Sequence, residues 1–358
     1  MATDSYTNIM EYKISEVLWK YMSPCLMVVG LVGNILVFVV LSKSSMRQTT
    51  TSLYLRFMSV FDGLVLYTGL MRNWIIHLID YDVREYSPAV CKIHMWASYW
   101  TTYCSGWLLV SVTLERCFSV WFPHKVKMVC TKRKSYLIII IIILVMMTLS
   151  GHYLYGRGDY VETIDNDTII FPCDNIYDDY DEFEIFLWPW VDFCIYGLFP
   201  STILTICNIS IIYKVVSSSR HILHNDSSGG TSIQNRSVSS RRNQASSLTA
   251  MLLITSFTYV VCTTPFCIYM IYINTLDFDK YDRPQEWADT ELVWLVVNML
   301  QYSNNCINFI LYCISGKRFR DQLCALCSRR ARRHPEIYSL RISSAGNNTR
   351  SSNADSSF

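Results

Sequence analysis

The ionisable residues that fall inside apolar stretches are those whose chemistry the sequence indicates most directly. Asp62 stands alone among apolar residues, and Glu115 and Arg116 are adjacent near the end of a later apolar stretch. A carboxylate in such surroundings needs a partner, because an unpaired charge there costs several kcal/mol. No Cys-x-x-Cys pair is matched by a second pair or by spaced histidines, and His-Glu-x-x-His does not occur. The sequence therefore predicts neither a structural zinc site nor a metal-dependent membrane enzyme.

Long apolar stretches must position these residues. Of the 358 residues, 51% are hydrophobic and only 17% are charged, whereas soluble domains carry about 25% charged residues. A helix needs about 20 apolar residues to cross a hydrocarbon core roughly 30 Å thick. Such stretches lie near residues 17–42, 52–79, 88–122, 135–157, 185–215, 244–274 and 289–313. We therefore predict an all-α bundle of seven transmembrane helices and exclude a soluble globular enzyme.

The charges of the loops predict the orientation of the bundle. Segment 124–134 has five Lys or Arg and no acid, whereas segment 158–184 has ten acids and neither Lys nor Arg. Because positively charged loops stay in the cytosol, we expect residues 1–16 outside the cell, without a cleaved signal peptide, and the C-terminus inside. Asn166 begins a glycosylation sequon on the outer side. The net charge of +2 provides no basic excess for binding nucleic acid.

Two cysteines stand apart from the rest. Of the 14 cysteines, only Cys91 and Cys173 fall at or beyond the predicted outer surface. In an oxidising compartment two such cysteines are expected to form a disulfide. The alternative is that both remain free thiols. The bond would tie the outer end of the third helix to the acidic loop.

Several short motifs resemble those of the rhodopsin-like G-protein-coupled receptors, and they span residues 17–330. Gly33-Asn34-Ile35-Leu36-Val37 resembles the family's Gly-Asn-x-x-Val, and Glu115-Arg116-Cys117 resembles Asp-Arg-Tyr. Arg116 also lies 25 residues after Cys91 and seven before Pro123, which are both family spacings. The remaining matches are Pro200, Cys262-Thr263-Thr264-Pro265, the seventh-stretch set Asn304, Asn305, Asn308 and Tyr312, and the following Gly316-Lys317-Arg318-Phe319-Arg320.

The resemblance implies roles for the intramembrane polar residues. Asp62 would hold a sodium ion together with Ser105, Asn304 and Asn308; the alternative is a protonated Asp62 bonded to the same side chains. Glu115, Arg116 and Tyr312 would serve coupling. Arg116 would pair with Glu115 at rest and, once released, meet the α subunit of a heterotrimeric G protein. Thr263 and Phe309 depart from the usual Trp and Pro, so basal activity is not predicted.

The resemblance also implies a ligand pocket in the outer half of the bundle. Its lining would comprise Ser98, Tyr99, Thr102, Phe266, Met270, Asn298 and Tyr302. Ser98 stands where receptors for biogenic amines have Asp, and Tyr302 stands where opsins have the retinal-binding Lys, so neither subfamily is indicated. Arg72 lies ten residues after Asp62, about 15 Å further out along a helix. It would either extend to the membrane surface or anchor an anionic ligand group.

The acidic loop favours a basic peptide ligand, as in the peptide-receptor branch of the family. Ten acids create a field that attracts cations, although a merely solvated loop is the alternative. The second hypothesis is a chemosensory receptor for small molecules, which would depend on Arg72 and not on the loop. A seven-helix transporter is the distant alternative, because neither a proton relay nor internal repeats are evident. The protein is not predicted to be an enzyme.

The cytosolic segments predict regulation and membrane contact. Segments 217–247 and 331–358 are polar and expected to be disordered, and their serines are candidates for phosphorylation by a receptor kinase and recruitment of arrestin. Residues 314–330 have the pattern of an amphipathic helix on an anionic lipid surface, with Phe319, Leu323 and Leu326 on one face. Cys324 and Cys327 on that helix are candidates for palmitoylation. No cofactor is predicted apart from the sodium ion.

Overall fold

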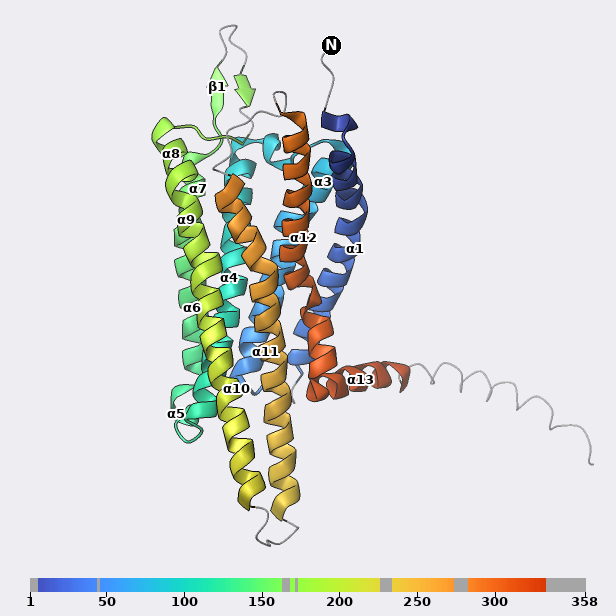
Figure 1. The fold of residues 1–358 in the computed structure, drawn as a ribbon, viewed down its shortest axis with the longest axis vertical. Helices are drawn as coiled ribbons and strands as arrows, with labels where there is room; N and C mark the ends of the chain where they lie inside the picture. Colours follow the sequence, from blue (N-terminus) through green and yellow to red (C-terminus); the bar gives the residue numbers. More distant parts are fainter. Residues whose placement is uncertain are drawn as a thin grey trace, which may run out of the picture.

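The structure is a computed structural model that describes residues 6–43, 46–162, 168–170, 173–225, 234–273 and 283–332. It is an elongated bundle of helices, with strand β1 at one end and helix α13 toward the other, where α10 and α11 extend furthest (Figure 1). We call these the disulfide end and the α13 end. The elements are η1 (Tyr6–Asn8), α1 (Met10–Leu41), α2 (Thr50–Val65), η2 (Leu66–Leu70), α3 (Met71–Ile79), η3 (Val83–Tyr86), α4 (Pro88–Trp121), α5 (Val126–Val129), α6 (Lys132–Leu149), η4 (Ser150–His152), α7 (Tyr153–Gly156), β1 (Tyr160–Glu162), β2 (Thr168–Ile170), α8 (Asp178–Glu182), η5 (Phe183–Leu187), α9 (Trp188–Asp192), η6 (Phe193–Leu198), α10 (Phe199–Asn225), α11 (Gln234–Ile273), α12 (Pro284–Ser315) and α13 (Lys317–Arg332).

The predicted all-α bundle of seven long helices is confirmed. The second, fourth and fifth helices are each assembled from successive elements, α2 to α3, α6 to α7 and α8 to α10. Strands β1 and β2 form a short antiparallel hairpin in which Tyr160 is paired with Ile170, and it is the only sheet in the described part of the chain. Five of the long helical segments are apolar enough by composition to cross a membrane. The other two, α4 and α12, have the length but carry many buried polar side chains.

Several helices extend beyond the predicted apolar stretches. The first helix begins at Met10 and not at 17, and its initial turns are packed against α12 through Ser15, whose hydroxyl donates to the Glu291 carbonyl oxygen over 3.4 Å. Residues 10–16 of the predicted N-terminal segment are therefore helical. Helices α10 and α11 also continue into segment 217–247, to Asn225 and from Gln234. Extending a formed helix costs far less free energy than nucleating a new one, so polar residues can continue a helix that apolar residues began. Their composition alone therefore did not indicate where these helices end.

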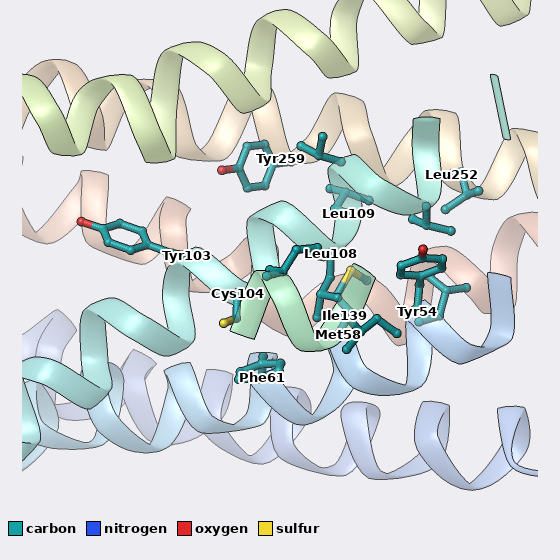
Figure 2. Packing of buried hydrophobic residues seen from close by; sticks show 14 of the residues in the cluster. Tyr54, Met58, Phe61, Tyr103, Cys104, Leu108, Leu109, Ile139, Leu252 and Tyr259 are labelled. Carbon is teal, nitrogen blue, oxygen red and sulfur yellow. The ribbon is translucent and has the colours of Figure 1, made fainter. Parts of the chain in front are cut away.

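Helix α4 runs through the centre of the bundle and contacts α2, α6, α10 and α11. The core around it is apolar, and Figure 2 shows Met58, Leu108 and Ile139 from α2, α4 and α6 meeting there. Gly106 on α4 allows a close approach, because a Cβ atom at this position would lie 2.8 Å from the Tyr259 hydroxyl oxygen. The central helix thus brings polar groups of several helices within reach of one another.

Two prolines inside helices each leave a backbone carbonyl oxygen without its usual N–H donor. A side chain from a neighbouring helix donates to that oxygen instead. Pro24 has no N–H for the carbonyl of Lys20, and the indole of Trp74 on α3 donates to that oxygen over 3.1 Å. Pro200 likewise has no N–H for the carbonyl of Tyr196, which accepts the hydroxyl of Tyr259 over 2.6 Å. An unsatisfied carbonyl would be costly where no water is available. These two bonds therefore join helices that apolar packing alone would orient less strictly.

We predict that Trp74→Phe destabilises the protein by about 1 kcal/mol, because it leaves the Lys20 carbonyl oxygen without a donor. Equilibrium unfolding of the purified protein in detergent would measure the change. Trp190→Phe is the matched control, since the Trp190 side chain is 56% exposed. Equal stabilities of the two variants would contradict the prediction.

Candidate functional site

Asp62 is the centre of a buried polar cluster that joins four helices. Its carboxylate accepts hydrogen bonds from the Ser105 hydroxyl on α4 and from the amides of Asn305 and Asn308 on α12, both over 2.8 Å. Asn34 on α1 in turn donates to the Asn305 carbonyl oxygen over 3.0 Å. Asn304, which we expected in this set, is buried but makes no recorded contact with Asp62 in the described chain, and Asn305 takes its place.

The residues of this cluster fit a small, hard cation. The side-chain oxygens of Asn305 and Asn308 are buried and have no hydrogen-bond partner among the described residues. Exchanging the nitrogen and oxygen of an amide requires only a rotation of the group. With that rotation, Asp62, Ser105, Asn305 and Asn308 would present carboxylate, hydroxyl and amide oxygens, which are the donors that hard cations prefer.

A cavity of about 500 Å³ opens between the helices nearer the disulfide end. All the predicted pocket residues except Met270 line it, so Met270 is a correction to the predicted set. The predicted residues that do so are Arg72, Ser98, Tyr99, Thr102, Phe266, Asn298 and Tyr302. A volume of this size is typical of a site for a small ligand or for the end of a larger one.

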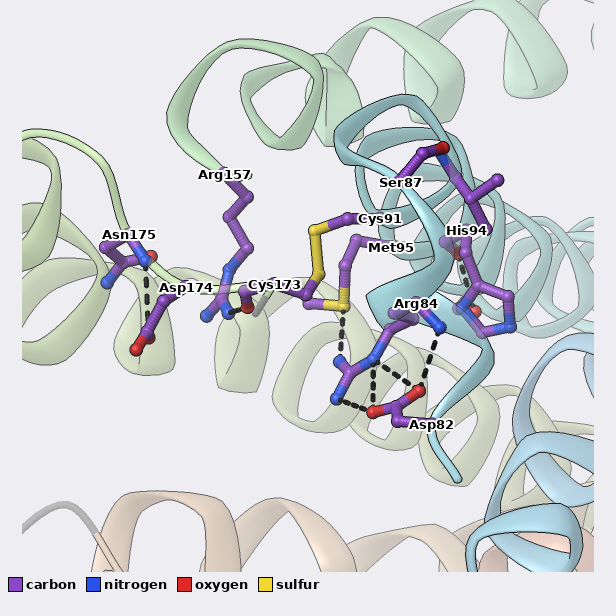
Figure 3. Close-up of a disulfide and its surroundings, with 12 residues drawn as sticks. Asp82, Arg84, Ser87, Cys91, His94, Met95, Arg157, Cys173, Asp174 and Asn175 are labelled. Carbon is purple, nitrogen blue, oxygen red and sulfur yellow. Dashed lines mark hydrogen bonds and ion pairs between the residues drawn. A yellow bond between two sulfur atoms is a disulfide. The ribbon is translucent and has the colours of Figure 1, made fainter. Parts of the chain in front are cut away.

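Arg72 forms an ion pair within the protein. The sequence had predicted instead that it extends to the membrane surface or anchors an anionic ligand group. Its guanidinium donates to Asp82 over 2.5 Å, and Arg84 donates to the same carboxylate over 2.8 Å. Figure 3 shows Arg84 between Asp82 and the sulfur of Met95. Burial by itself would raise the pKa of Asp82, but the hydrogen bonds and charges of the two arginines outweigh it and hold that pKa well below its ordinary value. Arg72 is therefore not a free anchor for an anion.

Two carboxylates in the cavity, neither of them predicted from the sequence, have no cationic partner among the described residues. Asp192 on α9 is only 6% exposed and accepts one hydrogen bond, from the Tyr103 hydroxyl. Glu291 on α12 lines the same cavity, and its carboxylate has no recorded partner in the described chain. The signal for Asp192 was present, since it is a single acid inside the apolar stretch 185–215. Such acids are functional candidates by default, as they are expensive to keep within a membrane.

At the α13 end, the charged side chains of Glu115 and Arg116 are hydrogen-bonded to hydroxyl groups. The Glu115 carboxylate accepts from Thr50 and, over 3.3 Å, from Ser135, while Arg116 donates to Thr51. The expected ion pair between Glu115 and Arg116 is absent from the salt bridges of the described residues. The reason is geometric, because α2 and α6 place hydroxyls closer to each group. Nearby, the Tyr312 hydroxyl is buried without a hydrogen-bond partner in the described chain, and its ring packs on Phe319 of α13.

The predicted disulfide between Cys91 and Cys173 is present, with Cα atoms 5.4 Å apart (Figure 3). Gly158 makes room for it, since it has a φ of +68° and a Cβ there would lie 3.2 Å from the Cys91 sulfur. Arg157 forms an ion pair with Glu184, so one of the ten acids of the loop is neutralised. Cys324 on α13 is exposed. Asn166, the Cys327 side chain and residues 333–358 lie outside the described parts.

The model of the family described as "7 transmembrane receptor (rhodopsin family)" matches residues 33–312. The chain belongs to this family. The growth hormone secretagogue receptor type 1 of Mus musculus is 25% identical over 306 residues, covering 82% of this receptor and 76% of the relative. The C-C chemokine receptor type 1 of Homo sapiens is 24% identical over 315 residues, covering 86% and 78%. The cysteinyl leukotriene receptor 1 of Cavia porcellus is 22% identical over 304 residues, covering 83% and 80%.

These matches establish a multi-pass receptor of the plasma membrane that responds to an extracellular ligand and couples to a G protein, and not an enzyme. The three relatives are named for three unlike ligands, a secretagogue, a chemokine and a leukotriene. The class of ligand must therefore be argued from the site of this receptor.

We predict that sodium stabilises the purified receptor and that Asp62→Asn abolishes the effect. Raising sodium to about ten times its dissociation constant should stabilise by about 1.4 kcal/mol. Thermal unfolding in sodium chloride and in choline chloride of equal ionic strength would measure the difference. A sodium effect that survives in Asp62→Asn would place the cation elsewhere.

Proposed function

We propose that this receptor lies with its disulfide end outside the cell, binds a basic peptide there and activates a heterotrimeric G protein at the α13 end. The charges of the loops and the position of the disulfide support this orientation, because disulfides persist on the oxidising side. Asn166, if glycosylated, would then be on the same side as the cavity.

The observation that carries the proposal is the charge of the cavity. Arg72 and Arg84 share Asp82, whereas Asp192 and Glu291 have no cationic partner among the described residues. Asp82, Asp192 and Glu291 carry three formal negative charges and Arg72 and Arg84 two positive ones, so these five groups leave one net negative charge. A cavity of this charge favours a cationic ligand. The ion pair with Asp82 also engages Arg72, the residue on which a chemosensory receptor for small molecules would depend.

The acidic loop supports the same proposal from outside the cavity. Asp178, Asp179 and Glu182 are exposed at the beginning of the long helix that includes α9. Acids at a helix N-terminus also stabilise the helix through its dipole, so part of their role is structural. Their exposure nevertheless leaves their field directed into solvent, where it raises the rate at which cations arrive.

Coupling at the α13 end would begin with the release of Arg116. In the structure its guanidinium is held by the Thr51 hydroxyl, and its Nε is buried without a partner in the described chain. A neutral acceptor binds a guanidinium less strongly than a carboxylate does. Release therefore costs less than breaking an ion pair, and the freed group could meet the G-protein α subunit.

Helix α13 would lie on the inner leaflet. Phe319 anchors it to the bundle by packing on Phe309 and Tyr312, and Leu323 and Leu326 contact the same core. Palmitoyl groups on Cys324 and Cys327 would strengthen its contact with the membrane. Phosphorylated serines of the following tail would recruit arrestin.

The central test is nucleotide exchange in cells that express the receptor with a promiscuous G protein. A pool of basic peptides should stimulate exchange, protease treatment of the pool should abolish the response, and Arg116→Ala should suppress it. A response that survives protease would overturn the peptide ligand, and silence with surface expression confirmed would overturn the proposed function.

We predict that neutralising Asp178, Asp179 and Asp181 together lowers potency about tenfold at low ionic strength and less at high salt, because screening weakens long-range steering. Dose–response curves at two salt concentrations would measure this. Glu286→Gln is the control, since Glu286 is an exposed acid paired with Arg283. Unchanged potency in the triple variant would show that the loop is merely solvated.

We further predict that Thr51→Val raises basal nucleotide exchange about tenfold, because it removes the hydrogen bond that holds Arg116. Valine has the shape of threonine, and the site is 2% exposed, so the fold should persist. Thr101→Val is the matched control, since that buried hydroxyl donates within its own helix, to the carbonyl oxygen of Ala97. Basal exchange at or below the unmodified level would contradict the role of Thr51.

A further inference from the structure

Asp192 is the most enclosed carboxylate of the cavity. It lies on α9 with 6% of its surface exposed, and one of its oxygens accepts the Tyr103 hydroxyl. No other hydrogen bond or ion pair to this carboxylate occurs in the described residues. Because the side chain also lines the cavity, its second oxygen is available to a ligand group that enters.

Tyrosine rings surround this carboxylate. Tyr99, Tyr103 and Tyr196 all line the cavity, with the ring of Tyr103 centred 6.0 Å from that of Tyr99 and 6.1 Å from that of Tyr196. Aromatic faces attract cations that approach within about 6 Å of the ring centroid. A carboxylate among such faces suits an organic cation and disfavours an anion.

We infer that Asp192 and the tyrosines around it anchor a cationic group of the ligand, an ammonium or a guanidinium, at the bottom of the cavity. This rests on the proposed function and makes it more specific.

The depth of the anchor constrains the ligand. Tyr103 lies twelve residues beyond Cys91 along α4, which places it about 18 Å below the disulfide. An extended peptide covers that distance with about five residues. The end of a peptide chain that enters from the disulfide end could place a cation at this depth. A second basic group could then pair with Glu291, which lies near the beginning of α12.

Asp192 also directly precedes the segment that contacts α11. The Tyr196 hydroxyl accepts from Gln301 on α12 over 3.3 Å, and its backbone carbonyl accepts from Tyr259 on α11. A cation that binds to Asp192 and Tyr196 would change the contacts that Tyr196 makes with both α11 and α12. The anchor is thus placed where binding can bias the arrangement of the helices.

The test uses the purified full-length receptor and defined cations. The probes are agmatine, phenethylamine and arginine amide, with N-acetylphenethylamine and phenylacetate as neutral and anionic matches. Thermal unfolding at increasing probe concentration should show stabilisation by the cations only. Asp192→Asn should raise the concentration for half-maximal stabilisation about 30-fold, and Asp289→Asn, an exposed acid outside the cavity, should leave it unchanged.

Three results would overturn the inference: no stabilisation by any cationic probe, equal stabilisation by the neutral match, or an unchanged response in Asp192→Asn. Asparagine can still accept the Tyr103 hydroxyl, so that variant is expected to fold, and its unfolding temperature without probe verifies this. Nucleotide exchange is measured separately. Peptide-stimulated exchange that is insensitive to Asp192→Asn would overturn the anchor while leaving the receptor function intact.

Discussion

A carboxylate buried in the middle of an apolar bundle is the constraint on which much of this structure depends. Asp62 is 1% exposed and would be prohibitively costly without donors. Its donors come from α4 and α12, and Asn34 of α1 bonds to the backbone of the same α12 turn. Four helices are thereby held in one rotational setting. The proposed sodium ion would bind in the same oxygen-rich cluster, so stability and sensitivity to sodium would have one origin.

The need to satisfy polar groups without water recurs along the bundle. The carbonyls released by Pro24 and Pro200 take their hydrogen bonds from Trp74 and Tyr259 on neighbouring helices. Arg116 is likewise held by a threonine of another helix. These contacts between helices are few and local. A rearrangement can exchange them individually while the apolar core shown in Figure 2 remains packed.

Charged side chains have different kinds of partner at the two ends of the bundle. At the disulfide end, Asp82 accepts from two arginines, whereas Asp192 and Glu291 have no cationic partner among the described residues. At the α13 end, Glu115 and Arg116 are adjacent in sequence yet bonded to hydroxyls of different helices. On the proposed function, the first arrangement would select the charge of the ligand, and the second would allow the Arg116 guanidinium to be released.

The sequence by itself determined the number of long helices, the fold class and the Cys91–Cys173 disulfide, because apolar length and the position of cysteines are properties of the chain. Seven of the eight residues predicted for the ligand pocket also line the cavity, six of them predicted through the family resemblance. Only the tertiary structure decided that Asn305 and not Asn304 reaches Asp62, that Met270 does not line the cavity, and that Arg72 pairs with Asp82. Neighbouring residues on a helix differ by about 100° in direction. Which of them meets a partner therefore depends on how each helix is rotated against the others, and packing across the bundle sets that rotation.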